Sequence, residues 1–240
     1  MKMNDKKLIA FDLDGTLSQH RTPVPDGNIA VLRALSEKYK LIMVGAGNCN
    51  RIWEQLGRFP IDIIGCYGME YAEYDDKTGT LPVKSSADVP CDRESIISRC
   101  ATLRERYGYT EYAGDSVVFH KSGAWTFALL GSDARIEDKL VFDPTRAKRK
   151  LFYDDVKATF PDYTVFLGGS SSFDMAPAPY DKYYALDSYC RAHGLAHSDV
   201  VFFGDDTEPG GNDYSVYSSD FDFVKVDDYT KFPEYAKFLL

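Results

Sequence analysis

Short, continuous apolar runs separated by helix-length segments constrain the fold of this chain most strongly. Toward the N-terminus these runs are Leu8–Phe11, Leu41–Val44 and Ile61–Ile64, and toward the C-terminus they are Val200–Phe203 and Phe223–Val226. Strands that are apolar throughout are typical of parallel sheets covered by helices on both faces. The amphipathic or helical stretches between and after these runs are 28–39, 51–56, 183–193 and 232–240. The pattern therefore predicts an α/β fold with a doubly wound parallel sheet.

The middle of the chain has a different pattern. Its expected elements are helices at 93–107 and near 146–160, and strand-like pieces at 116–120, 124–130 and 163–166. Hairpin-like strands mixed with helices are typical of an α+β unit with an antiparallel sheet. We therefore predict two domains, a discontinuous core formed by residues 1–80 and 180–240 and an inserted α+β cap formed by residues 81–179.

Composition narrows the classes of function. The 240 residues carry 28 Lys and Arg against 37 Asp and Glu, a net charge of −9, which disfavours binding to nucleic acid. The longest basic cluster, RAKRK at 146–150, is read as a solvated helix face. No segment approaches the roughly 20 apolar residues of a membrane helix. The charged MKMNDKK start and five cysteines without a C-x-x-C motif favour a cytoplasmic protein.

Acidic residues follow two of the predicted strands directly. Asp12 and Asp14 come after the first apolar run, and Asp205 and Asp206 come after VVFF at 200–203. Ligands of doubly wound sheets bind beyond the carboxyl ends of the strands. Such a group of carboxylates repels itself unless a hard cation with oxygen ligands, typically Mg²⁺, binds there. One carboxylate can then attack a phosphoryl group while another transfers a proton.

The hexapeptide FDLDGT at 11–16 resembles the nucleophile motif of the haloacid dehalogenase-like (HAD) phosphotransferase superfamily. The resemblance implies a HAD Rossmann-like core in which Asp12 is the nucleophile that becomes an aspartyl-phosphate. It implies that Asp14 is the general acid/base and that Thr16 helps to position Asp14. The Asp12 carboxylate and the backbone carbonyl of Asp14 would bind Mg²⁺.

Two longer segments, GGSSSFDMAPAPYDK at 168–182 and FFGDDTEPGGNDYSVY at 202–217, are similar to eukaryotic-type phosphomannomutases. Within HAD, the resemblance therefore favours a branch of phosphomannomutase-like enzymes and Cof-type sugar phosphatases. It implies that Lys182 neutralises the nucleophile and the phosphate and that Asp205 is a metal ligand. Asn212 and Asp213 would order the metal shell.

The same resemblance implies contacts to the substrate. Arg21 ends a T-L-x-x-x-R pattern that the mutases share, and Ser172 and Asp174 match cap positions that contact the sugar or phosphate. For Ser172 and Asp174 a plain strand end is a serious competing interpretation. The mutases commonly form dimers through the cap. A homodimer is therefore one interpretation of the apolar segment AWTFALL at 124–130, although burial in the core is the default for such a strand.

This sequence departs from the family pattern after the second strand. HAD enzymes normally place a Ser or Thr there to bind the transferred phosphate, and this chain has Gly47 followed by Asn48. The loop N–H groups or the Asn48 amide are expected to substitute for the missing hydroxyl. The alternative is that Gly47 serves a turn and the contact is lost.

The cap departs from the pattern as well. Lys121 and Ser132 stand where the mutases have two arginines that grip a second phosphate, and a third falls near Lys139. Arg135, Arg146 and Arg149 are candidates to compensate, but the sequence alone makes them ordinary surface charges. Without that grip, water becomes the better acceptor.

These features favour a Mg²⁺-dependent phosphohydrolase that acts on a phosphorylated sugar or a similar small metabolite. A phosphomannomutase is the close alternative, and a non-catalytic protein that binds a phosphorylated ligand is the third interpretation.

Overall fold

The computed structural model describes residues 6–240, so the first five residues of the charged N-terminal segment lie outside it. The described chain divides into two compact units. The first, called the core unit, contains the described chain up to Ala87 together with Asp181–Pro209 and Asp213–Leu240. The second, called the cap unit, contains Asp88–Tyr180 and Gly210–Asn212. The expected domain limits at 80/81 and 179/180 stay a prediction.

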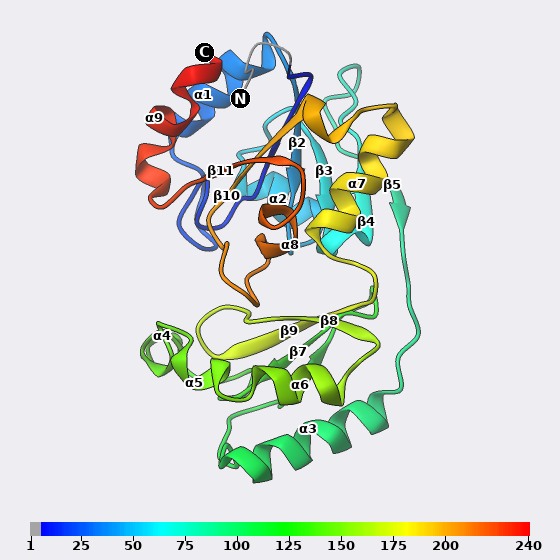
Figure 1. The fold of residues 1–240 in the computed structure, drawn as a ribbon, viewed down its shortest axis with the longest axis vertical. Helices are drawn as coiled ribbons and strands as arrows, with labels where there is room; N and C mark the ends of the chain where they lie inside the picture. Colours follow the sequence, from blue (N-terminus) through cyan, green and yellow to red (C-terminus); the bar gives the residue numbers. More distant parts are fainter. Residues whose placement is uncertain (1–5) are drawn as a thin grey trace. The chain divides into compact units, whose positions relative to one another are not determined.

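A seven-stranded sheet forms the centre of the core unit, in the order β11-β10-β1-β2-β3-β4-β5 (Figure 1). Its strands are β1 (Leu8–Phe11), β2 (Lys40–Val44), β3 (Asp62–Gly65), β4 (Glu70–Ala72), β5 (Val83–Ser86), β10 (Val200–Gly204) and β11 (Asp222–Lys225). The five strands that the apolar runs predict are mutually parallel. The short strands β4 and β5 extend the sheet in antiparallel pairing and were not expected.

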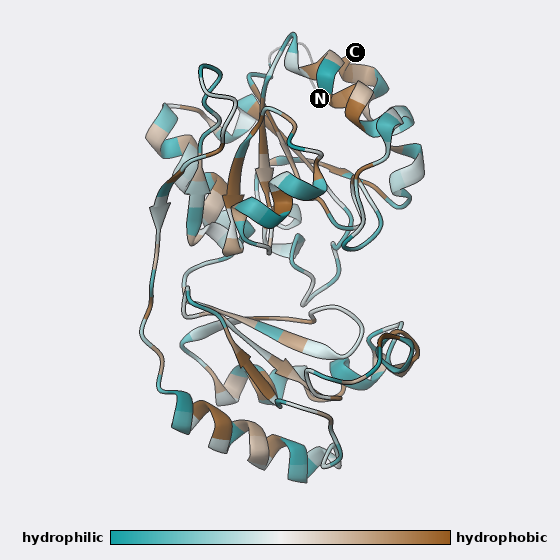
Figure 2. Cartoon of the chain, turned by 180° about the vertical axis from the view of Figure 1, so that it is seen from behind, coloured by the Kyte–Doolittle hydropathy of each residue, from teal (hydrophilic) through white to brown (hydrophobic). Residues whose placement is uncertain are grey.

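Helices pack on both faces of this sheet. They are α1 (Asp26–Ser36), α2 (Cys49–Gln55), α7 (Lys182–His193), α8 (Tyr214–Tyr217) and α9 (Phe232–Ala236). Alternate residues of β1 enter two separate apolar clusters: Ile9 and Phe11 pack with α1 and α9, and Leu8 and Ala10 pack with α7. The central strands are correspondingly brown in Figure 2. The doubly wound arrangement is therefore confirmed.

The cap unit is built on a four-stranded antiparallel sheet in the order β6-β7-β9-β8. Its strands are β6 (Val117–Phe119), β7 (Trp125–Ala128), β8 (Tyr163–Phe166) and β9 (Ser172–Pro177). Its helices are α3 (Arg93–Tyr107), α4 (Ile136–Phe142), α5 (Ala147–Lys150) and α6 (Tyr153–Thr159). The expected helix near 146–160 is thus two helices, because the chain turns at Leu151 and Phe152.

One face of the cap sheet carries the cap's apolar core. Trp125 and Phe127 of β7 and Phe173 of β9 pack there with residues of α3 and α6. Because side chains alternate along a strand, Thr126 and Asp174 lie on the opposite face, where the Thr126 hydroxyl donates to Asp174 Oδ1 at 2.8 Å. The AWTFALL segment is therefore interior, as the default interpretation expects.

Two further features are the lengths of the helices and the state of the cysteines. Within residues 6–240, no helix combines the length and the apolar character that crossing a membrane requires. The five cysteines are all free thiols.

The short 3₁₀ turns of the described residues lie at Cys66–Gly68, His197–Asp199, Tyr229–Lys231 and Lys237–Leu239.

Candidate active site

The strand order of the core sheet places a switch point between β1 and β10. From β1 the chain continues to β2 on one side, whereas β10 and β11 lie on the other. The backbone N–H of Asp12 donates to the carbonyl of Phe203 at 2.8 Å, so both strands end at the same edge. Open α/β sheets bind their ligands beyond the carboxyl ends at such a point. Asp12 and Asp205 therefore lie where this type of fold forms a site.

Lys182 lies between two carboxylates at this edge. It is the first residue of α7, whose N-cap is Asp181, and its side chain is wholly buried. Its Nζ donates to Asp12 Oδ1 at 2.6 Å and to Asp213 Oδ1 at 2.7 Å. Burial alone lowers the pKa of Lys182, but the two carboxylates outweigh it and raise the net pKa above its ordinary value. The lysine therefore stays charged in this environment.

Asp213 is held by backbone groups as well as by the lysine. The N–H groups of Asp205 and Asp206 each donate to Asp213 Oδ2 at 3.0 Å. A Cβ on Gly204 would lie 2.7 Å from this carboxylate, so the glycine allows the close approach. The segment after β10 thus wraps around one buried carboxylate.

Three carboxylates converge here and outnumber the lysine. Oxygens of Asp12, Asp205 and Asp213 lie within 4.8 Å of one another. Burial raises the pKa of Asp12 well above its usual range, and Lys182 offsets only part of this effect. Burial, followed by the charge of Asp213, raises the pKa of Asp205 to about 6. Buried, closely spaced oxygen ligands with excess negative charge suit a hard divalent cation.

Thr16 contacts a different residue from the one expected. Its buried hydroxyl donates to Asp205 Oδ1 at 2.9 Å rather than to Asp14, so it orients a carboxylate of the acidic cluster. Gly15 makes room for this contact, because a Cβ there would lie 2.4 Å from Asp205 Oδ2 and its φ of +98° favours glycine. The DGT turn therefore connects β1 to β10 through Asp205.

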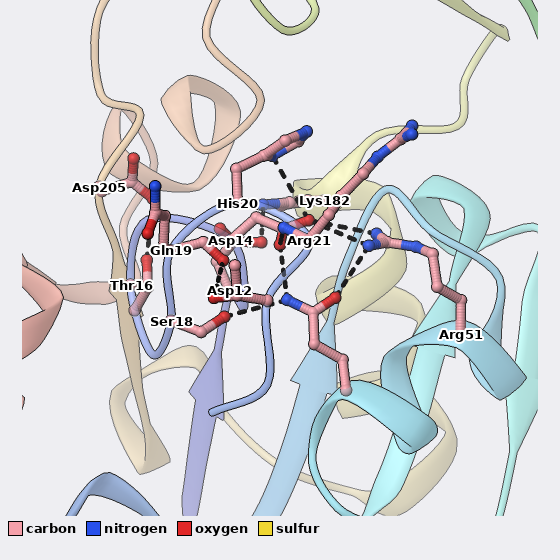
Figure 3. A network of polar contacts seen from close by, with 12 residues as sticks. Asp12, Asp14, Thr16, Ser18, Gln19, His20, Arg21, Arg51, Lys182 and Asp205 are labelled. Carbon is pink, nitrogen blue, oxygen red and sulfur yellow. Dashed lines mark hydrogen bonds and ion pairs between the residues drawn. The ribbon is translucent and has the colours of Figure 1, made fainter. Parts of the chain in front are cut away.

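Asp14 is held by two side chains that the sequence analysis did not select, together with the backbone of Arg21 (Figure 3). Gln55 Nε2 donates to its Oδ1 at 2.7 Å, and Arg51 Nη1 and Nη2 donate to its Oδ2 at 3.2 and 3.3 Å. The backbone N–H of Arg21 donates to Oδ1 at 2.8 Å. Burial alone would raise the pKa of Asp14, but these contacts outweigh it and lower the net pKa. The i, i+4 spacing of Arg51 and Gln55 on the predicted helix was the available signal.

The loop after β2 does not arrange its side chains as expected. Asn48 is the N-cap of α2, and its Oδ1 accepts the backbone N–H of Arg51 at 2.8 Å. A Cβ on Gly47 would meet the Arg51 guanidinium, with Nη2 at 2.3 Å. The expected phosphate contacts of Gly47 and Asn48 stay predictions.

The other expected substrate residues lie in the cap unit. Lys121 is exposed after β6, and Ser172 and Asp174 are half-buried on β9. The hydroxyl of Ser172 donates to the carbonyl of Gly168 at 3.0 Å. Asn212 is half-buried and groups with the cap unit by its contacts, whereas Asp213 groups with the core unit. Their roles toward substrate and metal stay predictions.

Arg149 is not the surface charge that the RAKRK cluster suggested. Its side chain is wholly buried, and its Nε donates to Asp143 Oδ2 at 3.0 Å. Its Nη1 donates to the carbonyls of Gly168 and Ser172 at 2.6 and 2.7 Å. Arg149 therefore fixes the loop that precedes β9. Arg135 is exposed and pairs with Asp138 in the same unit.

The chain is similar in sequence and in fold to known proteins. The family model described as eukaryotic phosphomannomutase matches residues 113–228. Phosphomannomutase 1 of Mus musculus is 27% identical over 229 residues, which cover 90% of this chain and 85% of that protein. The phosphomannomutase of Saccharomyces cerevisiae is 29% identical over 225 residues, with 90% and 87% covered. The solved structure of a HAD subclass IIB sugar phosphatase superposes with a TM-score of 0.57 at 18% identity, covering 88% of this chain and 84% of that one.

Proposed function

Because the chain is a phosphomannomutase-like member of the HAD superfamily, we propose that it is a Mg²⁺-dependent phosphohydrolase acting on a phosphorylated sugar or a similar small phosphometabolite. The observation that carries this proposal is the Asp12–Lys182–Asp213 arrangement beside Asp205 and Asp14. It combines a buried carboxylate, a charged lysine and a neighbouring carboxylate that is held for proton transfer.

The reaction follows from the roles of these groups. Asp12 attacks phosphorus, forming a new O–P bond while the bond to the leaving alcohol breaks, and Asp14 gives a proton to the departing oxygen. Water then attacks the aspartyl-phosphate, Asp14 takes a proton from it, and phosphate leaves with Asp12 regenerated. Lys182 stabilises the negative charge on the phosphoryl oxygens throughout.

The metal has suitable ligands in the acidic cluster. Asp12, Asp205 and Asp213 would hold it, together with the Asp14 carbonyl and Asn212 that the resemblance implies. Bound Mg²⁺ supplies positive charge that stabilises the phosphoryl group as it is transferred. Within this cluster, Asp205 is oriented by the hydroxyl of Thr16.

We expect water, rather than a sugar hydroxyl, to accept the phosphoryl group, because the side chains of the cap unit that stand at the mutase arginine positions are poorly suited to bind a second phosphate. Ser132, one of the two residues that replace the mutase arginines, donates its hydroxyl to Asp133 Oδ1 at 2.8 Å. Lys139 donates to the carbonyl of Ser132 at 2.8 Å. Arg149 is wholly buried, and its N–H groups donate to Asp143 and to backbone carbonyls of the cap unit. A mutase must hold its bisphosphate intermediate by one phosphate while presenting the other.

Phosphomannomutase activity is the second candidate, because the curated relatives reported above bear that name. One preparation tests both candidates. Phosphate release is measured on a panel of sugar phosphates with Mg²⁺, beside conversion of mannose 1-phosphate to mannose 6-phosphate with a hexose bisphosphate activator. We expect release to exceed isomerisation at every activator level. Isomerisation that outpaces release would replace the phosphatase by the mutase. Stabilisation by phosphorylated ligands without any turnover would favour a binding protein.

A further inference from the structure

The side chain of Arg51 lies so close to Gly47 that no larger residue fits there, whereas the backbone conformation would allow one. The φ of Gly47 lies outside the left-handed region that favours glycine. An added Cβ, however, would lie 2.3 Å from Arg51 Nη2, 2.4 Å from Nε and 2.6 Å from Cζ. All three distances are far below van der Waals contact. The guanidinium of Arg51 therefore fills the space that a side chain at position 47 would need.

The guanidinium is held there by one of its edges. Nη1 and Nη2 both donate to Asp14 Oδ2, and Nη1 also donates to Gln55 Oε1 at 3.0 Å. Gln55 in turn donates to Asp14 Oδ1 and to the Ser18 hydroxyl, the latter at 3.0 Å. Arg51, Asp14 and Gln55 thus form a closed ring of contacts within the core unit. Figure 3 shows Arg51 pointing toward Asp14.

The other edge of the guanidinium keeps donors for a ligand. Arginine has five N–H donors, and the contacts to Asp14 and Gln55 use those of Nη1 and one of Nη2. Within residues 6–240, Nε and the second N–H of Nη2 have no hydrogen-bond partner. These two atoms form the edge that lies over Gly47. An edge with two parallel N–H groups suits two oxygens of a phosphoryl group.

The Arg51 side chain is accessible from solvent, and 35% of it is exposed. It lines an open hollow of about 370 Å³ together with Arg21, Thr22, Pro23 and Gln55. The hollow is therefore open to solvent. Its lining carries two positive charges, those of Arg51 and Arg21, and Asp14 balances only one of them.

We propose that Arg51, whose guanidinium occupies the space beside Gly47, donates to the transferring phosphoryl group and so replaces the hydroxyl that the family resemblance predicts at position 47. This proposal rests on the proposed function and specifies how the same site binds phosphate. One guanidinium then does two things: its Nη1/Nη2 edge orients Asp14, and its Nε/Nη2 edge binds the oxygens on which negative charge is stabilised. Gly47 and Arg51 form a matched pair, so neither should be exchanged alone.

The test is a double-mutant cycle with Gly47→Ser, Arg51→Ala and the combined variant. Arg51→Ala should lower kcat/KM about 100-fold, the usual effect of losing one oxyanion donor. Gly47→Ser should also lower activity, because the serine displaces the guanidinium, which is the flexible partner of the clash. The combined variant should be about tenfold or more active than Arg51→Ala, because the hydroxyl then takes the vacated position. Additive losses in the combined variant would overturn the proposal.

Binding of inorganic phosphate in the presence of Mg²⁺, measured by calorimetry, gives a readout that does not depend on turnover. We expect Arg51→Ala to weaken phosphate binding about tenfold and Arg51→Lys to weaken it less. Asp14→Asn removes the charge of the carboxylate that Arg51 orients, and adding Arg51→Ala to Asp14→Asn should still weaken phosphate binding. Unchanged phosphate affinity when Arg51→Ala is added to Asp14→Asn would show that Arg51 acts only through Asp14.

Two controls keep the outcome interpretable. Arg33→Ala removes an exposed arginine of α1 in the same unit and should change neither activity nor phosphate affinity. Arg51→Met keeps the aliphatic stem, so it replaces Arg51→Ala if the latter does not fold. Unchanged phosphate affinity in a folded Arg51→Met protein would contradict the proposal. A wild-type protein that binds phosphate but hydrolyses no substrate would refute the proposed function while leaving this test intact.

Discussion

Lys182 in the core unit and Arg149 in the cap unit are both wholly buried cations, but their surroundings differ in charge. Lys182 contacts two carboxylates, and Asp205 lies close enough to complete a cluster of three. Arg149 contacts one carboxylate, Asp143, and otherwise donates to backbone carbonyls. The core unit therefore keeps an excess of negative charge for a metal and a phosphoryl group. Asp143 balances the charge of Arg149 within the cap unit, as in a structural ion pair.

The largest expected effect comes from exchanging these two cations for a residue of similar length. Lys182→Met and Arg149→Met should each lower the free energy of unfolding by about 3–5 kcal/mol, because the first removes the cation from two buried carboxylates and the second from one. Only Lys182→Met should also lower kcat, by about 10³-fold, since only this side chain faces the reacting carboxylate.

Both variants are assayed at a temperature where they are folded, with unfolding monitored in denaturant. The comparison between the units fails if folded Arg149→Met loses kcat as severely as Lys182→Met. A change of KM alone in Arg149→Met agrees with it, because Arg149 fixes the loop before β9.

Removal of the metal should affect only the acidic cluster of the core unit. EDTA is expected to lower phosphate release at least about 100-fold, and Mg²⁺ should restore it. Asp205→Asn should raise the Mg²⁺ concentration needed for half-maximal rate about tenfold or more. Asp143→Asn in the cap unit and Asp227→Asn on the exposed surface are the matched controls. If Asp143→Asn shifts the Mg²⁺ requirement as Asp205→Asn does, the metal site has been assigned to the wrong unit.

The smallest expected effect concerns pH. His197 in the core unit contacts Asp220 at 2.6 Å and Asp187 at 3.1 Å. Burial lowers the pKa of His197, but the two aspartates outweigh it and raise the net pKa. The stabilisation is therefore fully present below about pH 6.5, the ordinary value, and is lost as the pH rises through the folded-state pKa.

Denaturant unfolding at pH 6 and pH 8 checks this sign. Between pH 6 and pH 8 the free energy of unfolding should fall by up to about 1 kcal/mol more in the wild type than in His197→Gln. The value is small because solvent screens the ion pairs of His197. His120→Gln in the cap unit is the control. A variant that becomes more pH-dependent than the wild type would contradict the assignment.

The sequence predicted the core sheet well because its strands are continuous apolar runs. Strands β4 and β5 were missed, since three or four residues of mixed polarity leave no periodic signal. Arg149 was misjudged because its partners come from Asp143 and from loop carbonyls distant in sequence, which no local pattern reveals.

The candidate site was predictable only in part. Asp12, Asp205 and Asp213 were selected from strand ends and from the family resemblance, and the fold brings them together. Arg51 and Gln55 were not selected, because their role arises from tertiary contact with Asp14. The spacing of the two residues on a helix identifies a shared face but not what that face contacts.

The central claim is that the core unit transfers a phosphoryl group from the substrate to Asp12 and then to water. Acid quenching of the enzyme during turnover, followed by mass analysis of its peptides, tests this most directly. We expect a phosphoryl group on the peptide that contains Asp12, decaying at the rate of phosphate release and absent in Asp12→Asn. Turnover without any phosphorylated Asp12 peptide, or full activity of Asp12→Asn, would contradict the account.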